Sequence, residues 1–109
     1  MAGRFVLKTS SDAQTYFILQ SGNYQTILTG ERYRHKSSAL NGIESVRENA
    51  PIDGRYERKP SGSQWMFNLK AANGQIIGTS ERYTTEAAME NGIQSVKDNG
   101  PHANLVDET

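Results

Sequence analysis

The chain alternates apolar and polar residues in short runs, then changes to a longer run with helical spacing, and it does this twice. In residues 15–20 and 65–70, aromatic and branched side chains alternate with others, which is typical of strands. In residues 39–46 and 89–96, small or apolar residues recur at i, i+3, i+4 and i+7, the spacing of one helix face. These two stripes consist of Ala39, Gly42, Ile43 and Val46, and of Met89, Gly92, Ile93 and Val96.

The two helical runs belong to an internal duplication that covers almost the whole chain. "LNGIESVRENAP" ends the first copy and "ENGIQSVKDNGP" ends the second, while "GRFVLK" and "GRYERK" open them. We therefore predict one domain over residues 1–109, made of repeats 3–51 and 54–101, with 102–109 as a closing strand and tail. A unit of about fifty residues buries too little surface to be stable alone, so we expect the repeats to share one core.

The dipeptide Asn73–Gly74 between two strand runs predicts a two-residue type I′ hairpin turn. Such a turn fixes the register, because neighbouring residues of a strand point to opposite faces of the sheet. One face should carry Phe17, Leu19, Thr26 and Leu28 with Phe67, Leu69, Ile76 and Gly78, and we expect this face to be the core. The other face should carry Tyr16, Ile18, Ile27, Met66 and Ile77.

The five residues of this second face are a candidate binding surface. If both helices cover the core face, the second face is an exposed apolar patch, and such patches mark partner surfaces. A protein or peptide is the partner that this surface would suit. The alternative is that loops, the tail or the curvature of the sheet cover these side chains.

The hairpin "AANGQIIG", followed by the Asn-Gly-Ile helix that ends in asparagine and proline, resembles the YegP-like family of small, uncharacterised bacterial proteins. The resemblance covers nearly all of the chain as a tandem repeat of a domain of unknown function. It implies an α+β fold: two β-β-β-α(-β) repeats with pseudo-twofold symmetry form one antiparallel sheet packed by two helices. It also implies that the last strands are exchanged between repeats, and it implies no activity.

The amino-acid composition disfavours or excludes several classes of function. Twelve basic and twelve acidic residues cancel, which disfavours a protein that binds nucleic acid by neutralising phosphates. There is no cysteine, so thiol chemistry and thiolate metal sites are excluded. With a mean hydropathy of −0.70 and no long apolar run, we expect no membrane span and no signal peptide, and a cytoplasmic monomer.

The repeated "ERY" segment is the most visible polar identity between the copies. Arg32 and Tyr33, with Arg82 and Tyr83, could form an anion or small-molecule site on the pseudo-twofold axis, which would suit a binder or an enzyme. The alternative is structural: each tyrosine packs over the start of its helix, while the glutamate and arginine pair locally.

Other candidate chemistry is sparse. Residues 32–36, "RYRHK", combine basic and aromatic side chains that could bind nucleic acid weakly, or be only a solvated cluster. His35 and His102 have no partner at the spacing of metal ligands, so we predict no metal site and no cofactor. The sequence shows no nucleophile paired with a base. It therefore favours a non-enzymatic binding module.

Overall fold

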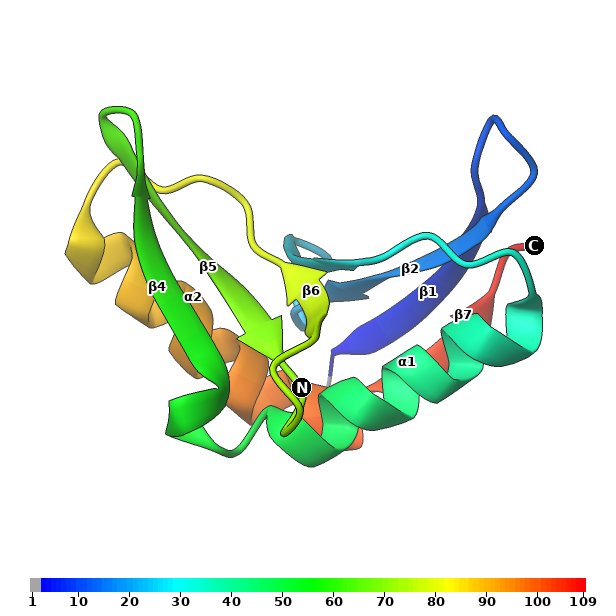
Figure 1. Cartoon of the computed structure of the whole chain (residues 1–109). Helices are drawn as coiled ribbons and strands as arrows, with labels where there is room; N and C mark the ends of the chain where they lie inside the picture. Colours follow the sequence, from blue (N-terminus) through cyan, green and yellow to red (C-terminus); the bar gives the residue numbers. More distant parts are fainter. Residues whose placement is uncertain (1–2) are drawn as a thin grey trace.

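The structure, a computed structural model, describes residues 3–109 as one seven-stranded sheet with two helices on one of its faces (Figure 1). The strands lie in the order β4-β5-β6-β3-β2-β1-β7, so each repeat supplies one half of the sheet. The elements are β1 (Arg4–Thr9), β2 (Thr15–Gln20), β3 (Thr26–Gly30), α1 (Lys36–Asn49), η1 (Asp53–Arg55), β4 (Tyr56–Ser61), β5 (Gln64–Lys70), β6 (Ile76–Thr79), α2 (Glu86–Asn99), η2 (Gly100–His102) and β7 (Asn104–Asp107). The fold is α+β, as predicted.

The last strand crosses from the second repeat to the first. β7 follows α2 and pairs with β1, from Arg4 opposite Asn104 to Leu7 opposite Asp107. The implied strand exchange is therefore confirmed for this strand. The sheet is mixed, however, because β7 runs parallel to β1. A parallel pair needs a long connection between its strands, which the chain from β2 to α2 provides, so the expectation of a wholly antiparallel sheet was wrong.

The two halves of the sheet meet along a very short seam. β3 and β6 pair only at Thr29 with Thr79 and at Gly30 with Gly78. Both glycines are needed, since a Cβ atom at Gly30 would lie 2.4 Å from the Phe17 ring and one at Gly78 would lie 2.6 Å from Leu28. Beneath the seam, buried side chains from both repeats form a single hydrophobic cluster.

The turn at Asn73 differs from the prediction. Gly74 donates its backbone N–H to Ala71 at 2.9 Å, and Ala71 donates to Gln75 at 2.9 Å. Gly74 has a φ of 85°, but Asn73 does not have the positive φ that a type I′ turn requires. The loop is instead a type I turn closed by one left-handed residue. Tyr24 takes the same position in the first repeat, with a φ of 65°.

Each of these hairpins also contains a bulge, which changes the predicted faces. The register shifts after Leu19 in β2 and after Leu69 in β5, leaving Ile27 and Ile77 as extra residues. Both isoleucines join the core at 6% exposure. The prediction that they lie on the open face was wrong. Thr26 and Ile76, assigned to the core face, are instead only half-buried and pair with Gln20 and Lys70.

Both helices end where the prolines predict. α1 ends at Asn49 and α2 at Asn99, two residues before Pro51 and Pro101. Their predicted apolar stripes are buried and face the sheet. The helix face opposite the stripe is exposed. α1 lies mainly against β2 and also reaches β6, and α2 lies mainly against β5 and also reaches β3.

Candidate functional site

On the open face of the sheet, apolar side chains lie next to one another in the half that the first repeat forms. Tyr16 and Ile18 of β2 are half-buried there, beside Val6 of β1, which is 2% exposed. Val6 lies between Ile18 on one side and Val106 of β7 on the other. Of the five predicted patch residues, the structure leaves Tyr16, Ile18 and Met66 on this face, and Met66 is in the other half.

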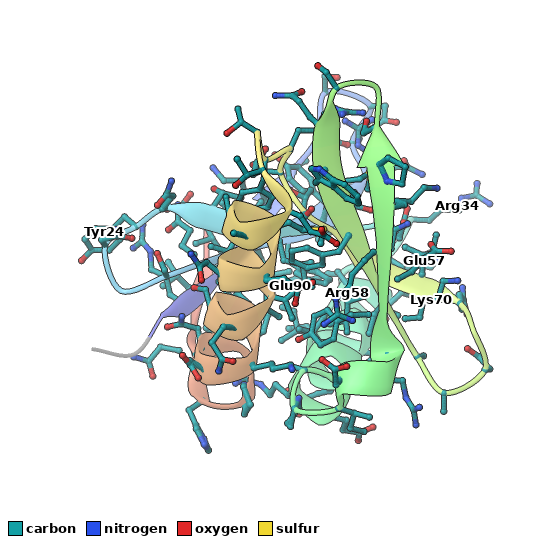
Figure 2. The ribbon with its side chains drawn as sticks, turned by 90° about the vertical axis from the view of Figure 1, so that its left-hand side faces the viewer. Tyr24, Arg34, Glu57, Arg58, Lys70 and Glu90 are labelled. Atoms are coloured by element: carbon teal, nitrogen blue, oxygen red, sulfur yellow. The ribbon has the colours of Figure 1, made fainter. Side chains whose placement is uncertain are left out.

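The second repeat's half of the open face carries a polar network. Asn68 donates to Glu57 Oε1 at 3.0 Å and accepts from Thr79 Oγ1 at 3.0 Å, although Asn68 is only 5% exposed. Lys70 lies 3.2 Å from Glu57, and both side chains project to the same side of β4 (Figure 2). The Asn68 amide and then the Lys70 ammonium hold the pKa of Glu57 below its usual range. The predicted apolar patch therefore does not extend across the whole face.

Each ERY tyrosine packs against the glycine in the middle of its own repeat's helix. A Cβ atom at Gly92 would lie 2.4 Å from the Tyr83 hydroxyl, and one at Gly42 would lie 2.7 Å from that of Tyr33. At Gly42 the Phe17 ring of β2 is the next neighbour, at 3.1 Å from such a Cβ atom. Burial, and then the nearby glutamate of the same segment, raises the pKa of both tyrosines.

The two ERY arginines point toward opposite ends of the molecule. Arg82 donates from Nε to Ser61 Oγ at 2.8 Å, in the turn between β4 and β5. Arg32 lies close enough to Asp12, in the turn between β1 and β2, to add to the hydrogen bond from Ser10 that lowers the pKa of Asp12. The structure therefore does not bring Arg32 and Arg82 into one cleft on the pseudo-twofold axis.

A groove of about 510 Å³ lies where the two halves of the sheet separate. We call it the inter-repeat groove. The β2–β3 turn and the start of β3 form one wall, segment 81–83 forms the other, and α2 forms the floor. Its lining consists of Ser21, Gly22, Asn23, Gln25, Thr26, Ile27, Glu81, Arg82, Tyr83, Ala88, Asn91, Gly92 and Ser95.

The groove exists because neighbouring strands stop pairing. β3 and β6 are joined over two residue pairs only, after which the chain beyond β6 follows β5. Tyr83 directs both its N–H and its C=O at Trp65, at 2.8 and 2.7 Å, so segment 81–83 stays with the second repeat. β3 stays with β2 in the first repeat. The space left between them is bordered by two strand edges.

The lining of the inter-repeat groove is polar and close to neutral. It offers amide groups on Asn23, Gln25 and Asn91, and hydroxyl groups on serine, threonine and Tyr83. Glu81 and Arg82 contribute one charge of each sign. This arrangement can donate and accept hydrogen bonds but presents no concentrated charge.

The pseudo-symmetric position in the other half is different. A groove of about 440 Å³ lies between the β5–β6 turn and the C-terminal half of α1, where Arg55 donates to Asn49 Oδ1 at 2.9 Å. Its lining includes neither Asn41 nor segment 31–33, the counterparts of Asn91 and segment 81–83. The two junctions are therefore not equivalent, and Asn41 provides a matched control for Asn91.

The basic segment 32–36 forms no cleft of its own. Arg32, Arg34 and Lys36 are exposed, and Arg34 projects into solvent (Figure 2). Lys36 forms an ion pair with Asp107 of β7. Both histidines are exposed. Within residues 3–109, no three histidine, aspartate or glutamate side chains come together as a metal site would require.

The fold and these surfaces define a two-repeat α+β protein with a groove between its repeats. Among the residues described, no helix has the length and apolar character needed to span a bilayer. The model of the family described as "Domain of unknown function (DUF1508)" matches residues 10–57 and again 61–107. The chain belongs to this family, in a tandem form.

The relatives share this description. The chain is 56% identical over 59 residues to the UPF0339 protein YegP of Escherichia coli (strain K12), and 51% identical over 61 residues to a UPF0339 protein of Pseudomonas aeruginosa. These alignments cover 54% and 56% of this chain, and the chain spans about half the length of the curated relatives it matches (54% and 56%).

Two solved structures are similar over nearly the whole chain. The solution structure of the protein of unknown function yegP from E. coli has a TM-score of 0.94 at 52% identity, covering 100% of this chain and 95% of that one. A UPF0339 protein from Shewanella oneidensis has a TM-score of 0.92 at 49% identity, covering 98% and 92%. The resemblance drawn from the sequence is confirmed, and no specific function comes with it.

Proposed function

We propose that the protein is a non-enzymatic binding module that holds a polar ligand in the inter-repeat groove. The observation that carries this proposal is the groove itself: its volume of about 510 Å³ falls in the range of ligand sites, and polar side chains converge on it from both repeats. A catalytic site generally adds a group with a strongly shifted pKa. In the groove lining, the resolved shift belongs to Tyr83, whose pKa is raised mainly by burial of its hydroxyl and then by Glu81.

The test is a titration of the ¹⁵N-labelled full chain, followed by backbone amide shifts. The probes are a blocked pentapeptide library, a set of mono- and disaccharides, and nucleoside monophosphates. We expect one class to shift amides of residues 25–27, 81–83 and 91–95. Asn91→Ala should weaken that binding about tenfold, since a hydrogen-bonding group is lost. Asn41→Ala, at the equivalent position of α1, should bind as the unaltered chain does.

The apolar half of the open sheet face supports a second candidate, docking of a protein partner. Tyr16 and Ile18 are half-buried, and Val6 connects Ile18 to Val106 across the face, so a partner would find apolar contacts there. If this surface binds, a partner protein shifts the amides of these residues while those of the groove stay unchanged. Shifts that are confined to the groove would rule this candidate out for the ligand concerned.

A further inference from the structure

The walls of the inter-repeat groove are strand edges whose pairing stops at the seam of the sheet. On one side, β3 pairs with β6 only at Thr29 and Gly30, so the start of β3, from Thr26 on, has no partner in β6 on the groove side. On the other side, Tyr83 turns both backbone groups toward Trp65. Ser80 also donates to Phe67 at 2.9 Å, so Ser80 and Tyr83 both bond to β5, and residues 81–82 between them are left without a backbone partner in β5.

Arg82 supports this reading directly. Within residues 3–109, neither its N–H nor its C=O makes a backbone hydrogen bond. Its side chain does not block the groove floor either, since its Nε reaches Ser61 at 2.8 Å. An unpaired strand edge is a template on which another extended chain can add.

From this geometry we propose that the ligand of the groove is an extended peptide, which inserts as a short strand between β3 and segment 81–83. This inference rests on the proposed function, because it names the ligand class for the same groove. The inserted peptide would continue the sheet across the gap beyond the seam. Its amides would bond alternately to the two walls.

The side chains of the groove indicate which peptides would fit. A strand laid between the walls passes over the floor formed by Ala88, Asn91 and Ser95, which suits small or polar side chains on that face. Glu81 and Arg82 together give no net charge, so strongly acidic or strongly basic peptides gain nothing from the lining. We therefore expect uncharged peptides rich in serine, threonine and small residues to be preferred.

The first experiment uses blocked pentapeptides selected from the library, with the full chain. For the tightest peptide, N-methylation of either of two adjacent central amides should weaken binding about tenfold, because each central amide donates to a different wall. N-methylation of the terminal amide should have little effect. The amide of Arg82 should exchange with solvent more slowly in the complex than in the free protein.

The second experiment fills the groove. Ala88→Trp places a large side chain on the floor and should abolish peptide binding, whereas Ser38→Trp, at the equivalent half-buried position of α1, should not. Both variants are first compared with the unaltered chain by urea unfolding, so that a loss of binding is read only from folded protein. Normal peptide binding by the Ala88→Trp variant would overturn the inference.

The outcomes separate this inference from the proposed function. Peptides that bind in the groove but tolerate both central N-methyl groups would overturn strand insertion and leave the binding module standing. Binding of saccharides or nucleotides there, with peptides inert, would do the same. If none of the probes shifts the groove amides, both proposals fail together.

Discussion

The first strands of the two repeats, β1 and β4, are equivalent in sequence position but differ in their surroundings. β1 is covered along its outer edge by β7, while β4 ends the sheet. Val6 and Leu7 of β1 are buried, and their counterparts in β4 are Glu57 and Arg58, which are partly exposed. The strand that β7 covers, β1, has apolar residues at these positions. The strand that no further strand covers, β4, has charged residues there.

The charged residues of β4 are paired. Arg58 Nε lies 2.6 Å from Glu90 of α2, and Arg58 Nη2 lies 2.9 Å from Asp53. Figure 2 shows Arg58 and Glu90 side by side between β4 and α2. In the first repeat the residue equivalent to Glu90 is Leu40, which packs against the core. Charged residues on an exposed edge strand prevent it from pairing with strands of other chains, so the charges of β4 protect this edge against association.

Proline strengthens the protection. Pro60 stands in β4 opposite Trp65, which turns its own N–H toward Tyr83 and away from β4. The backbone of Pro60 therefore faces outward, where a proline offers no N–H to an incoming strand. The lining of the inter-repeat groove contains no proline. This contrast supports the groove rather than β4 as the place where a strand adds.

The largest effect should come from exchanging residues between the two edges. Leu7→Arg puts the residue of the bare edge into the covered one, where Leu7 has no exposed surface, and should lower the free energy of unfolding by about 3 kcal/mol or more. The reciprocal Arg58→Leu should change it by less than about 1 kcal/mol. Urea unfolding of both variants measures the difference. Equal losses of unfolding free energy in the two variants would show that coverage by β7 does not determine which residues each strand tolerates.

Removing the cover should have the next largest effect. A chain ending at Ala103 loses β7, including the hydrogen bonds from Asn104 to Gly3 and from Glu108 to Leu7, and it uncovers Val6. We expect a loss of about 2 kcal/mol in unfolding free energy, together with concentration-dependent association through the bared edge of β1. Sedimentation and urea unfolding test this. A stable monomer would mean that β7 contributes little.

The contact between the helix glycine and the ERY tyrosine occurs in both repeats, so the same substitution should destabilise each repeat equally. Gly92→Ala gains helix propensity but drives a methyl group onto Tyr83, so we expect a net loss of about 1 kcal/mol, and the same for Gly42→Ala against Tyr33. Tyr83→Phe removes the closest atom and should recover part of the loss in a double mutant. Thermal unfolding measures both. A loss in one repeat alone would contradict the equivalence of this contact.

The smallest effect concerns the protonation of Asp53 beside the bare edge. Hydrogen bonds from Lys97 and then Arg58 lower the pKa of Asp53 to about 2. Because the folded pKa is depressed, the stabilisation is complete above the unfolded pKa of about 3.9 and is lost as the pH falls toward 2. Carboxyl NMR should show Asp53 titrating near 2, and higher in Lys97→Met. An unchanged titration in that variant would contradict the assigned cause.

The sequence was sufficient for the elements and the doubling, because both rest on local patterns. The buried helix stripes and the prolines that follow each helix act within a few residues, and they appear twice. The core phenylalanines and leucines, such as Phe17 and Phe67, follow from alternation within a strand. These features do not depend on what lies far away in the chain.

The turn type, the bulges and the groove could not be predicted, because they depend on the backbone conformation and strand pairing, which the local sequence pattern does not determine. A type I turn closed by a left-handed residue tolerates Tyr24 as well as Gly74. The amino-acid sequence therefore does not show that the loop is longer than the two-residue turn that was predicted. The bulges that bury Ile27 and Ile77 follow from the pairing of two strands rather than from either strand alone. The groove was missed for the same reason, since it exists only where β3 and β6 part.

Because β7 is at the far end of the chain from the strand it covers, the first repeat cannot be finished while the protein is being made. During synthesis, Val6 and the edge of β1 stay uncovered until β7 has emerged and α2 has folded. Such distant pairings slow folding. Until β7 is made, the nascent chain therefore exposes an unpaired strand edge, and such edges are prone to aggregation.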